Sequence, residues 1–123
     1  MPVRSLNSSI MKWPNRTQVH SAILQWIEQF AEADSKLAAA GYFGSYARDE
    51  AGVGSDLDVI MIVTENSLPF ERRYNLWDFS SVPVPVEAQV YTVEEWKRLP
   101  LRQPRYYETL VRETCWLYGK ALR

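Results

Sequence analysis

The sequence has very little cysteine, no long apolar run and almost no net charge. Cys115 is the single cysteine among 123 residues, which excludes an internal disulfide framework and a cysteine-based zinc site and is typical of a reducing compartment. No apolar run approaches the roughly 20 residues that a membrane span requires. The first residues, Met1 to Trp13, lack the apolar core of a signal peptide. We therefore expect a soluble, cytoplasmic protein with no membrane partner.

The charge balance argues against a second class of function. Fourteen Lys and Arg residues against fifteen Asp and Glu residues leave a formal net charge of -1. This balance gives no broad electrostatic footprint for nucleic acid, so we expect no direct binding of nucleic acid. The hydrophobic fraction of 46% is that of a globular protein. We expect a single domain over residues 1–123, with a polar and loosely ordered start over residues 1–12.

Periodicity and turn residues predict an alternation of helices and strands. Apolar residues at helical spacing predict a helix from Thr17 to Asp34. The apolar runs that end at Phe43 and Val63 predict two strands, the second of them central in a sheet. The other expected elements are short helices at Ser45–Glu50 and Phe70–Trp77, a near-edge strand at Val84–Tyr91, a helix capped by Thr92 that ends near Leu99, a helix from Pro104, and a strand at Cys115–Tyr118. The fold class is then α/β or α+β, a small mixed sheet with helices packed on it.

The stretch from Gly41 to Val63 organises the chain, and its most telling feature is a pair of carboxylates. Asp56 and Asp58 open the apolar run that ends at Val63. Residues two apart in a strand point to the same face, so these carboxylates would lie side by side. Like charges so placed repel each other unless a cation or a shared proton lies between them. We interpret the pair as half of a magnesium site, whereas an isolated Asp-x-Asp would more simply be a solvated turn.

A third carboxylate is expected from another strand. Glu87 is the best candidate because it is the only acidic residue in an otherwise apolar strand. Glu94 and Glu95 are explained more simply by the capping box that begins at Thr92. Asp56, Asp58 and Glu87 are therefore the predicted metal ligands.

Gly44-Ser45 is a candidate phosphate-binding turn. A glycine lets the backbone approach a phosphate closely, and the N–H groups that follow it at a helix N-terminus bind anions. Arg48 follows Ser45 by about one helical turn and could reach a triphosphate. The simpler alternatives are an ordinary strand-to-helix turn and a surface arginine.

Taken together, these residues resemble a known signature. Gly44-Ser45-x-x-Arg48, followed by Gly54-Ser55-Asp56-Leu57-Asp58 at the head of an apolar strand, resembles the polymerase-β-like nucleotidyltransferase superfamily, and within it the minimal nucleotidyltransferase (MNT) group. The resemblance implies that Gly44, Ser45, Arg48 and Ser55 bind the nucleotide. It also implies that Asp56, Asp58 and Glu87 hold one or two Mg²⁺ ions and are catalytic. The chain departs from the pattern at Asp49, where the family often has glycine, and at Glu87, where aspartate is common.

The resemblance implies transfer of NMP from ATP or another NTP to an acceptor hydroxyl. Only 36 residues follow Glu87, too few for the additional helical region that aminoglycoside-modifying relatives carry. Minimal nucleotidyltransferases often occur beside a HEPN-domain toxin and act as its antitoxin, in some cases by adenylylating it, so we expect such a protein partner. Two alternatives stay open: a homo-oligomeric small-molecule nucleotidyltransferase, and a non-catalytic antitoxin that neutralises its partner by contact.

Overall fold

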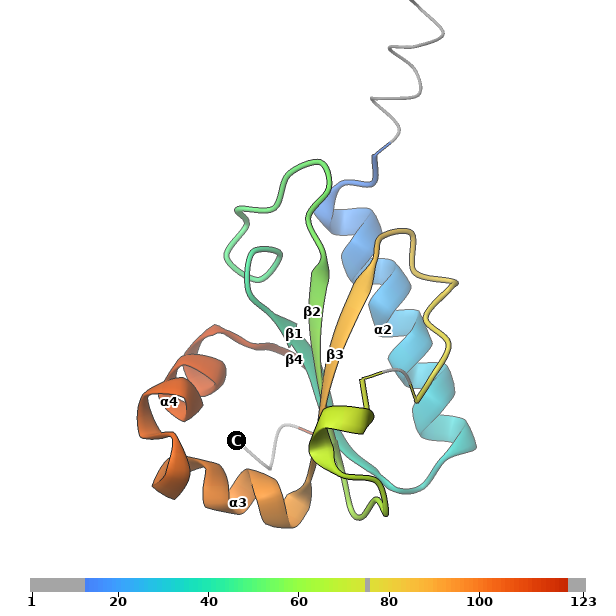
Figure 1. Cartoon of the computed structure of the whole chain (residues 1–123). Coiled ribbons are helices and arrows are strands. Elements are labelled where there is room, and N and C mark those ends of the chain that lie inside the picture. Colours follow the sequence, from blue (N-terminus) through green and yellow to red (C-terminus); the bar gives the residue numbers. More distant parts are fainter. Residues whose placement is uncertain (1–12, 75, 120–123) are drawn as a thin grey trace, which may run out of the picture.

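A computed structural model describes residues 13–74 and 76–119 of the chain (Figure 1). The loosely ordered start expected over residues 1–12 lies outside the described residues. None of the helices in the described ranges is long and apolar enough to cross a membrane. In chain order the elements are α2 (Arg16–Ala33), β1 (Leu37–Phe43), β2 (Leu57–Val63), the 3-10 turn η1 (Phe70–Arg72), β3 (Val86–Thr92), α3 (Val93–Arg102), α4 (Pro104–Glu113) and β4 (Cys115–Tyr118).

The four strands form one mixed sheet in the order β3-β2-β1-β4. β1 pairs antiparallel with β2 and with β4, whereas β2 pairs parallel with β3. β2 is almost entirely buried, as its uniformly apolar sequence predicts, and β3 is an edge strand, as its flanking prolines predict. The structure therefore confirms the expected fold class, an α+β domain with a small mixed sheet.

Helix α2 covers one face of the sheet, and α3 and α4 cover the other (Figure 1). Asn15 caps α2 in a reciprocal capping box with Gln18, which confirms the predicted helix start to within one residue. One core cluster joins α2 to the sheet residues Val59, Met61 and Val63. A second cluster joins α3 and α4 to the intervening residues of β2, Ile60 and Ile62. The period of two along β2 thus sends its side chains into two cores.

Two of the expected short helices are not formed as predicted. Residues 45–50 form a compact turn in which the N–H of Arg48 donates to the carbonyl of Gly44 at 3.0 Å, and Asp49 ends it with a φ of 59°. A residue in this left-handed conformation cannot continue an α-helix. The helix expected over Phe70–Trp77 is only the turn η1, which ends at Arg72. Arg73 follows as its C-cap, and the Arg73 side chain is buried in the protein.

Two boundaries also differ from the prediction. β3 begins at Val86 instead of Val84 and continues to Thr92. α3 runs past Leu99 to Arg102 despite containing Pro100. Pro100 removes one hydrogen bond near the end of the helix, and the N–H of Gln103 closes the last turn on the carbonyl of Leu99 at 2.7 Å.

Arg73 ties the loop between β2 and β3 to the start of α3. Its guanidinium is buried and donates to the carbonyls of Leu68 and Val90 at 2.7 and 3.1 Å, and both of its terminal nitrogens contact the carboxylate of Glu95. Glu95 also closes the predicted capping box with Thr92. Burial alone would raise the pKa of Glu95, but the hydrogen bonds from Arg73 and Thr92 outweigh it and hold the pKa below its usual value.

The depressed pKa of Glu95 makes a prediction about acid stability. Glu95→Gln should lower the free energy of unfolding at pH 7 by about 1–3 kcal/mol, because it removes a charged partner from buried Arg73. A carboxyl whose pKa is lower in the folded state contributes stability above its unfolded pKa and loses it as the pH falls through the folded pKa. The stability gap between wild type and variant should therefore close below about pH 4, as followed by urea unfolding across the pH range.

Glu94→Gln is the matched control, because Glu94 is exposed and pairs with Arg98 at 4.0 Å. It should change stability by less than about 0.5 kcal/mol at every pH. Equal effects of the two substitutions would contradict the role assigned to the Arg73–Glu95 pair.

Candidate functional site

The sheet register brings two of the predicted carboxylates together. In the parallel pair of β2 and β3, Asp58 lies directly opposite Glu87. Both side chains lie on the face that carries Ile60 and Ile62, and therefore on the side of α3 and α4. On the other side of β2, Asp58 pairs with Phe43, the last residue of β1. Gly44 follows Phe43 and so adjoins the same carboxylate.

Gly44 is in direct contact with Asp58. Its φ is +77°, a conformation that favours glycine, and a Cβ placed on it would lie 2.3 Å from Oδ2 of Asp58. The absence of a side chain at Gly44 therefore gives the carboxylate its space. We expected Gly44 to let a phosphate approach the backbone, and it also leaves room for the carboxylate of Asp58, a predicted catalytic residue.

The surroundings of Asp58 raise the pKa of its carboxyl above the ordinary value. Burial raises its pKa most, the negative charges of Glu87 and Asp56 raise it further, and the charge of Arg48 opposes them. Asp58 is half-buried, whereas Glu87 and Asp56 are exposed. The three carboxylates thus lie close enough for two of them to act electrostatically on the third.

Asp56 differs in position from the prediction. β2 begins at Leu57, so Asp56 lies just before the strand instead of within it. Within residues 13–74 and 76–119, no three His, Cys, Asp or Glu side chains are already gathered as a set of metal ligands. The structure pairs Asp58 with Glu87 and brings the charge of Asp56 near them, without a closed coordination shell.

The predicted nucleotide-binding residues lie between β1 and β2, with Ser45 and Arg48 in the turn that follows β1. Ser45 is half-buried next to Gly44. Arg48 donates from Nε to Glu50 at 2.9 Å and from Nη1 to Glu113, at the end of α4, at 3.1 Å. Ser55 uses its hydroxyl to accept the N–H of Gly52 at 2.9 Å, which stabilises the turn before Asp56. Arg48 and Ser55 are therefore engaged within the protein, as parts of the loop that holds the site.

Three residues of the site were not predicted from the sequence. Gln89 accepts hydrogen bonds at Oε1 from the phenols of Tyr91 and Tyr106, at 3.0 and 2.9 Å. Burial raises the pKa of Tyr106 and the charge of Asp58 adds to this rise, which brings α4 into the electrostatics of the site. Tyr74 is 65% exposed and lines a hollow of about 400 Å³ with Asp58 and residues 86–89. Gln89 shares a face with Glu87 by strand alternation, a signal that the sequence did contain.

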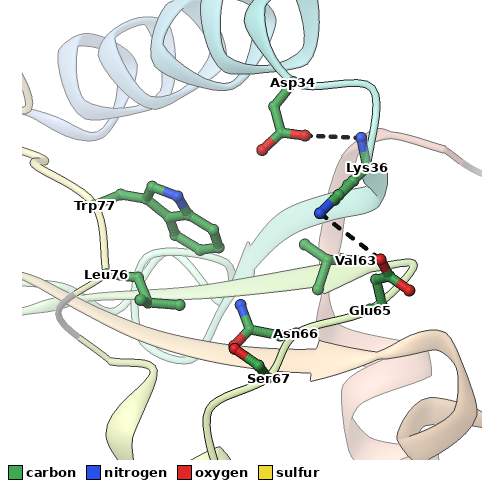
Figure 2. Close-up of a pocket in the computed structure, with 8 residues that line it drawn as sticks. All are labelled: Asp34, Lys36, Val63, Glu65, Asn66, Ser67, Leu76 and Trp77. Carbon is green, nitrogen blue, oxygen red and sulfur yellow. Dashed lines mark hydrogen bonds and ion pairs between the residues drawn. The ribbon is translucent and has the colours of Figure 1, made fainter.

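A second hollow, of about 520 Å³, lies at the other end of β2 (Figure 2). Its wall includes Val63 and Trp77. Lys36 pairs with Glu65 at 3.8 Å, and the backbone N–H of Lys36 donates to Asp34 at 2.9 Å. These polar groups contact one another, and we assign no chemistry to this hollow.

A family model described as a nucleotidyltransferase domain matches residues 24–116, which include β1 to α4 and all the candidate site residues. No curated protein matches the chain.

The contact between Gly44 and Asp58 predicts a difference between two glycines. Gly44→Ala should abolish nucleotidyl transfer and destabilise the fold by about 1–3 kcal/mol, because it adds a clash with Asp58 to the cost of a positive φ. Gly54→Ala carries the same kind of backbone cost at φ +88° but meets nothing within 4 Å. It should keep most of the activity, measured as pyrophosphate release at a temperature where both variants are folded. Equal activities would show that the clash does not matter.

The like-charge cluster predicts that the site costs stability. Ionised Asp58 has a raised pKa in the folded state, so it destabilises the fold above its unfolded pKa near 3.8 and has no such effect below it. Asp58→Asn should therefore raise the melting temperature of the metal-free protein at pH 7 by about 2–5 °C. The gain should vanish near pH 3. A lower melting temperature at pH 7 would contradict the cost assigned to an ionised, half-buried Asp58 beside like charges.

Proposed function

The chain belongs to the nucleotidyltransferase domain family, and from this premise we propose a magnesium-dependent transfer of AMP from ATP to a hydroxyl group of a partner protein. The observation that carries the proposal is the pairing of Asp58 with Glu87 on adjacent strands, with Gly44 against Asp58. Nucleotidyl transfer is the chemistry of the family. The metal, the nucleotide and the acceptor are the parts that we propose.

The carboxylates suit a hard divalent cation. Mg²⁺ prefers oxygen ligands and is usually held by one or two carboxylates together with substrate phosphates and water. Asp58 and Asp56 would hold it, with Glu87 as the third ligand. The burial and repulsion that raise the pKa of Asp58 are the conditions that a cation relieves. When bound, the metal neutralises the charge of the triphosphate and of the developing transition state.

The remaining steps are phosphate binding and proton transfer, and each is assigned to residues of the site. The backbone at Gly44 and Ser45 binds the phosphates. Arg48 lies close enough to Asp58 for its positive charge to lower the pKa of that carboxyl. The acceptor oxygen forms a bond to the α-phosphorus while the bond from that phosphorus to the pyrophosphate oxygen breaks. The hydroxyl proton passes to a carboxylate, for which Glu87 is our candidate, and pyrophosphate leaves. Catalysis is then mainly positioning and charge neutralisation.

The exposure of Asp56, Glu87 and Tyr74 supports a protein as the proposed acceptor. The hollow beside the carboxylates is bounded by the start of β3, Asp58 and Tyr74. A site that recognises a small molecule usually encloses most of its surface. A protein acceptor brings its own surface and needs less enclosure. A HEPN-type toxin, neutralised by adenylylation, is the partner that we propose.

The experiment is to incubate the chain with a purified HEPN-type partner, ATP and Mg²⁺ and to weigh the partner by intact-mass spectrometry. The wild type should add the mass of AMP. Asp58→Asn and Glu87→Gln should slow the addition by about a hundredfold or more, because metal charge stabilisation contributes several kcal/mol. Asp49→Asn is the matched control, because Asp49 is exposed and asparagine also adopts a positive φ. It should retain activity.

Two outcomes would overturn the proposal. One is an unmodified but stably bound partner, which would indicate neutralisation by contact alone. The other is equal modification by wild type and Asp58→Asn.

A further inference from the structure

The outer edge of β3 has a defined set of backbone groups. The N–H of Leu57 donates to the carbonyl of Pro85 at 2.8 Å, so the carbonyl of Pro85 faces β2. Backbone groups alternate in direction along a strand, so those of Glu87 also face β2, and those of Val86 and Ala88 face outward. The guanidinium of Arg73 confirms this direction two residues further on, because it reaches the carbonyl of Val90 at 3.1 Å from outside the sheet.

The edge is therefore covered at one end and unpaired at the other. Arg73 occupies the outward carbonyl of Val90. β3 is the last strand of the sheet, and the outward groups of Val86, which is half-buried, and of Ala88, which is 6% exposed, have no hydrogen-bond partner among residues 13–74 and 76–119. The unpaired end is the one that carries Glu87.

A hollow runs along this unpaired end. Its lining includes four consecutive residues of β3, Val86 to Gln89, together with Asp58 and Tyr74. Consecutive residues of a strand point to opposite faces, so a hollow that touches all four lies along the edge of the strand. Tyr74, 65% exposed, stands beside it as an aromatic surface.

We propose that this edge receives an extended segment of the acceptor protein as an added strand, which presents a hydroxyl side chain to Glu87 and Asp58. The inference rests on the proposed nucleotidyl transfer and specifies how the acceptor binds. Unpaired N–H and C=O groups of an edge strand recognise another backbone, which makes an extended peptide the matching ligand. The sequence around the hydroxyl then matters less than its extended conformation.

The register of an added strand places the hydroxyl on the correct face. A residue directly opposite Glu87 points its side chain to the face of Glu87, at about 4.5–5.5 Å between Cβ atoms. That is also the face of Asp58. The segment's hydroxyl oxygen forms the new bond to the α-phosphorus of ATP, its proton passes to a carboxylate, and pyrophosphate is released. The product is a phosphodiester of AMP on the segment.

The test uses the full chain, ATP, Mg²⁺ and capped seven-residue peptides of alternating valine and glutamine, with lysine at both ends and one central serine, threonine or tyrosine. The reference acceptors are the matching N-acetyl amino acid amides, which have the hydroxyl but no strand. We expect AMP to transfer to at least one peptide at least tenfold faster than to its reference amide. N-methylation of the central residue and N-methylation of its two neighbours block opposite edges of the peptide. One of the two should abolish the advantage, and the other should preserve it.

A pair of variants tests the same edge from the protein side. Tyr74→Ala should lower the ratio of peptide labelling to reference-amide labelling at least fivefold. Tyr118→Ala is the matched control, because Tyr118 is also exposed but lies on β4, at the other edge of the sheet. It should label both acceptors as the wild type does.

The outcomes separate the two proposals. The added strand would be overturned if the peptides were labelled no faster than the amides, or if both methylated forms were labelled equally. Labelling of the amides would still support nucleotidyl transfer in either case. A wild-type dimer that Tyr74→Ala dissociates, with no advantage of the peptides, would assign the edge to a second copy of the chain and also overturn the added strand. Failure to bind ATP with Mg²⁺ at all would overturn the proposed function, and the inference with it.

Discussion

The burial of Asp58 opposite a second carboxylate, Glu87, is the constraint on which the rest of the site depends. Their opposition is set by the parallel register of β2 and β3, which two separate cores hold in place. A change of register is opposed, because a shift by one residue would move the apolar residues of β2 from each core into the other and disrupt the packing of both. The protein therefore keeps two like charges side by side and leaves room for a compensating charge. A glycine at position 44 and exposure of Glu87 provide that room.

Most of this arrangement could be predicted from local sequence. The carboxylates, Gly44 and the order of strands and helices follow from alternation, turn chemistry and capping, which act over a few residues. The turn at residues 45–50 could not be predicted in this way, because the positive φ of Asp49 that ends it is known from the structure and not from the sequence. Tyr106 was also missed, because its proximity to Asp58 depends on how α4 crosses the sheet. Sequence periodicity does not show which residues far apart in the chain come into contact.

The position of β3 connects the carboxylates to the proposed binding of the acceptor. An edge strand usually carries a risk of unwanted pairing. Here Arg73, held by Glu95, covers the far end of the edge and leaves the end beside Glu87 unpaired. The ion pair that stabilises the loop thus also limits where another chain can pair. In the proposed added-strand mode, one buried guanidinium would thus couple stability to recognition.

The central claim is that Asp58 and Glu87 hold a metal-bound nucleotide, and calorimetric titration with a non-hydrolysable ATP analogue tests it most directly. The wild type should bind the analogue at least tenfold more tightly with Mg²⁺ than with EDTA. In Asp58→Asn and in Glu87→Gln this difference should disappear, while both variants stay folded. A metal-dependent affinity that is the same in the wild type and both variants would contradict the account.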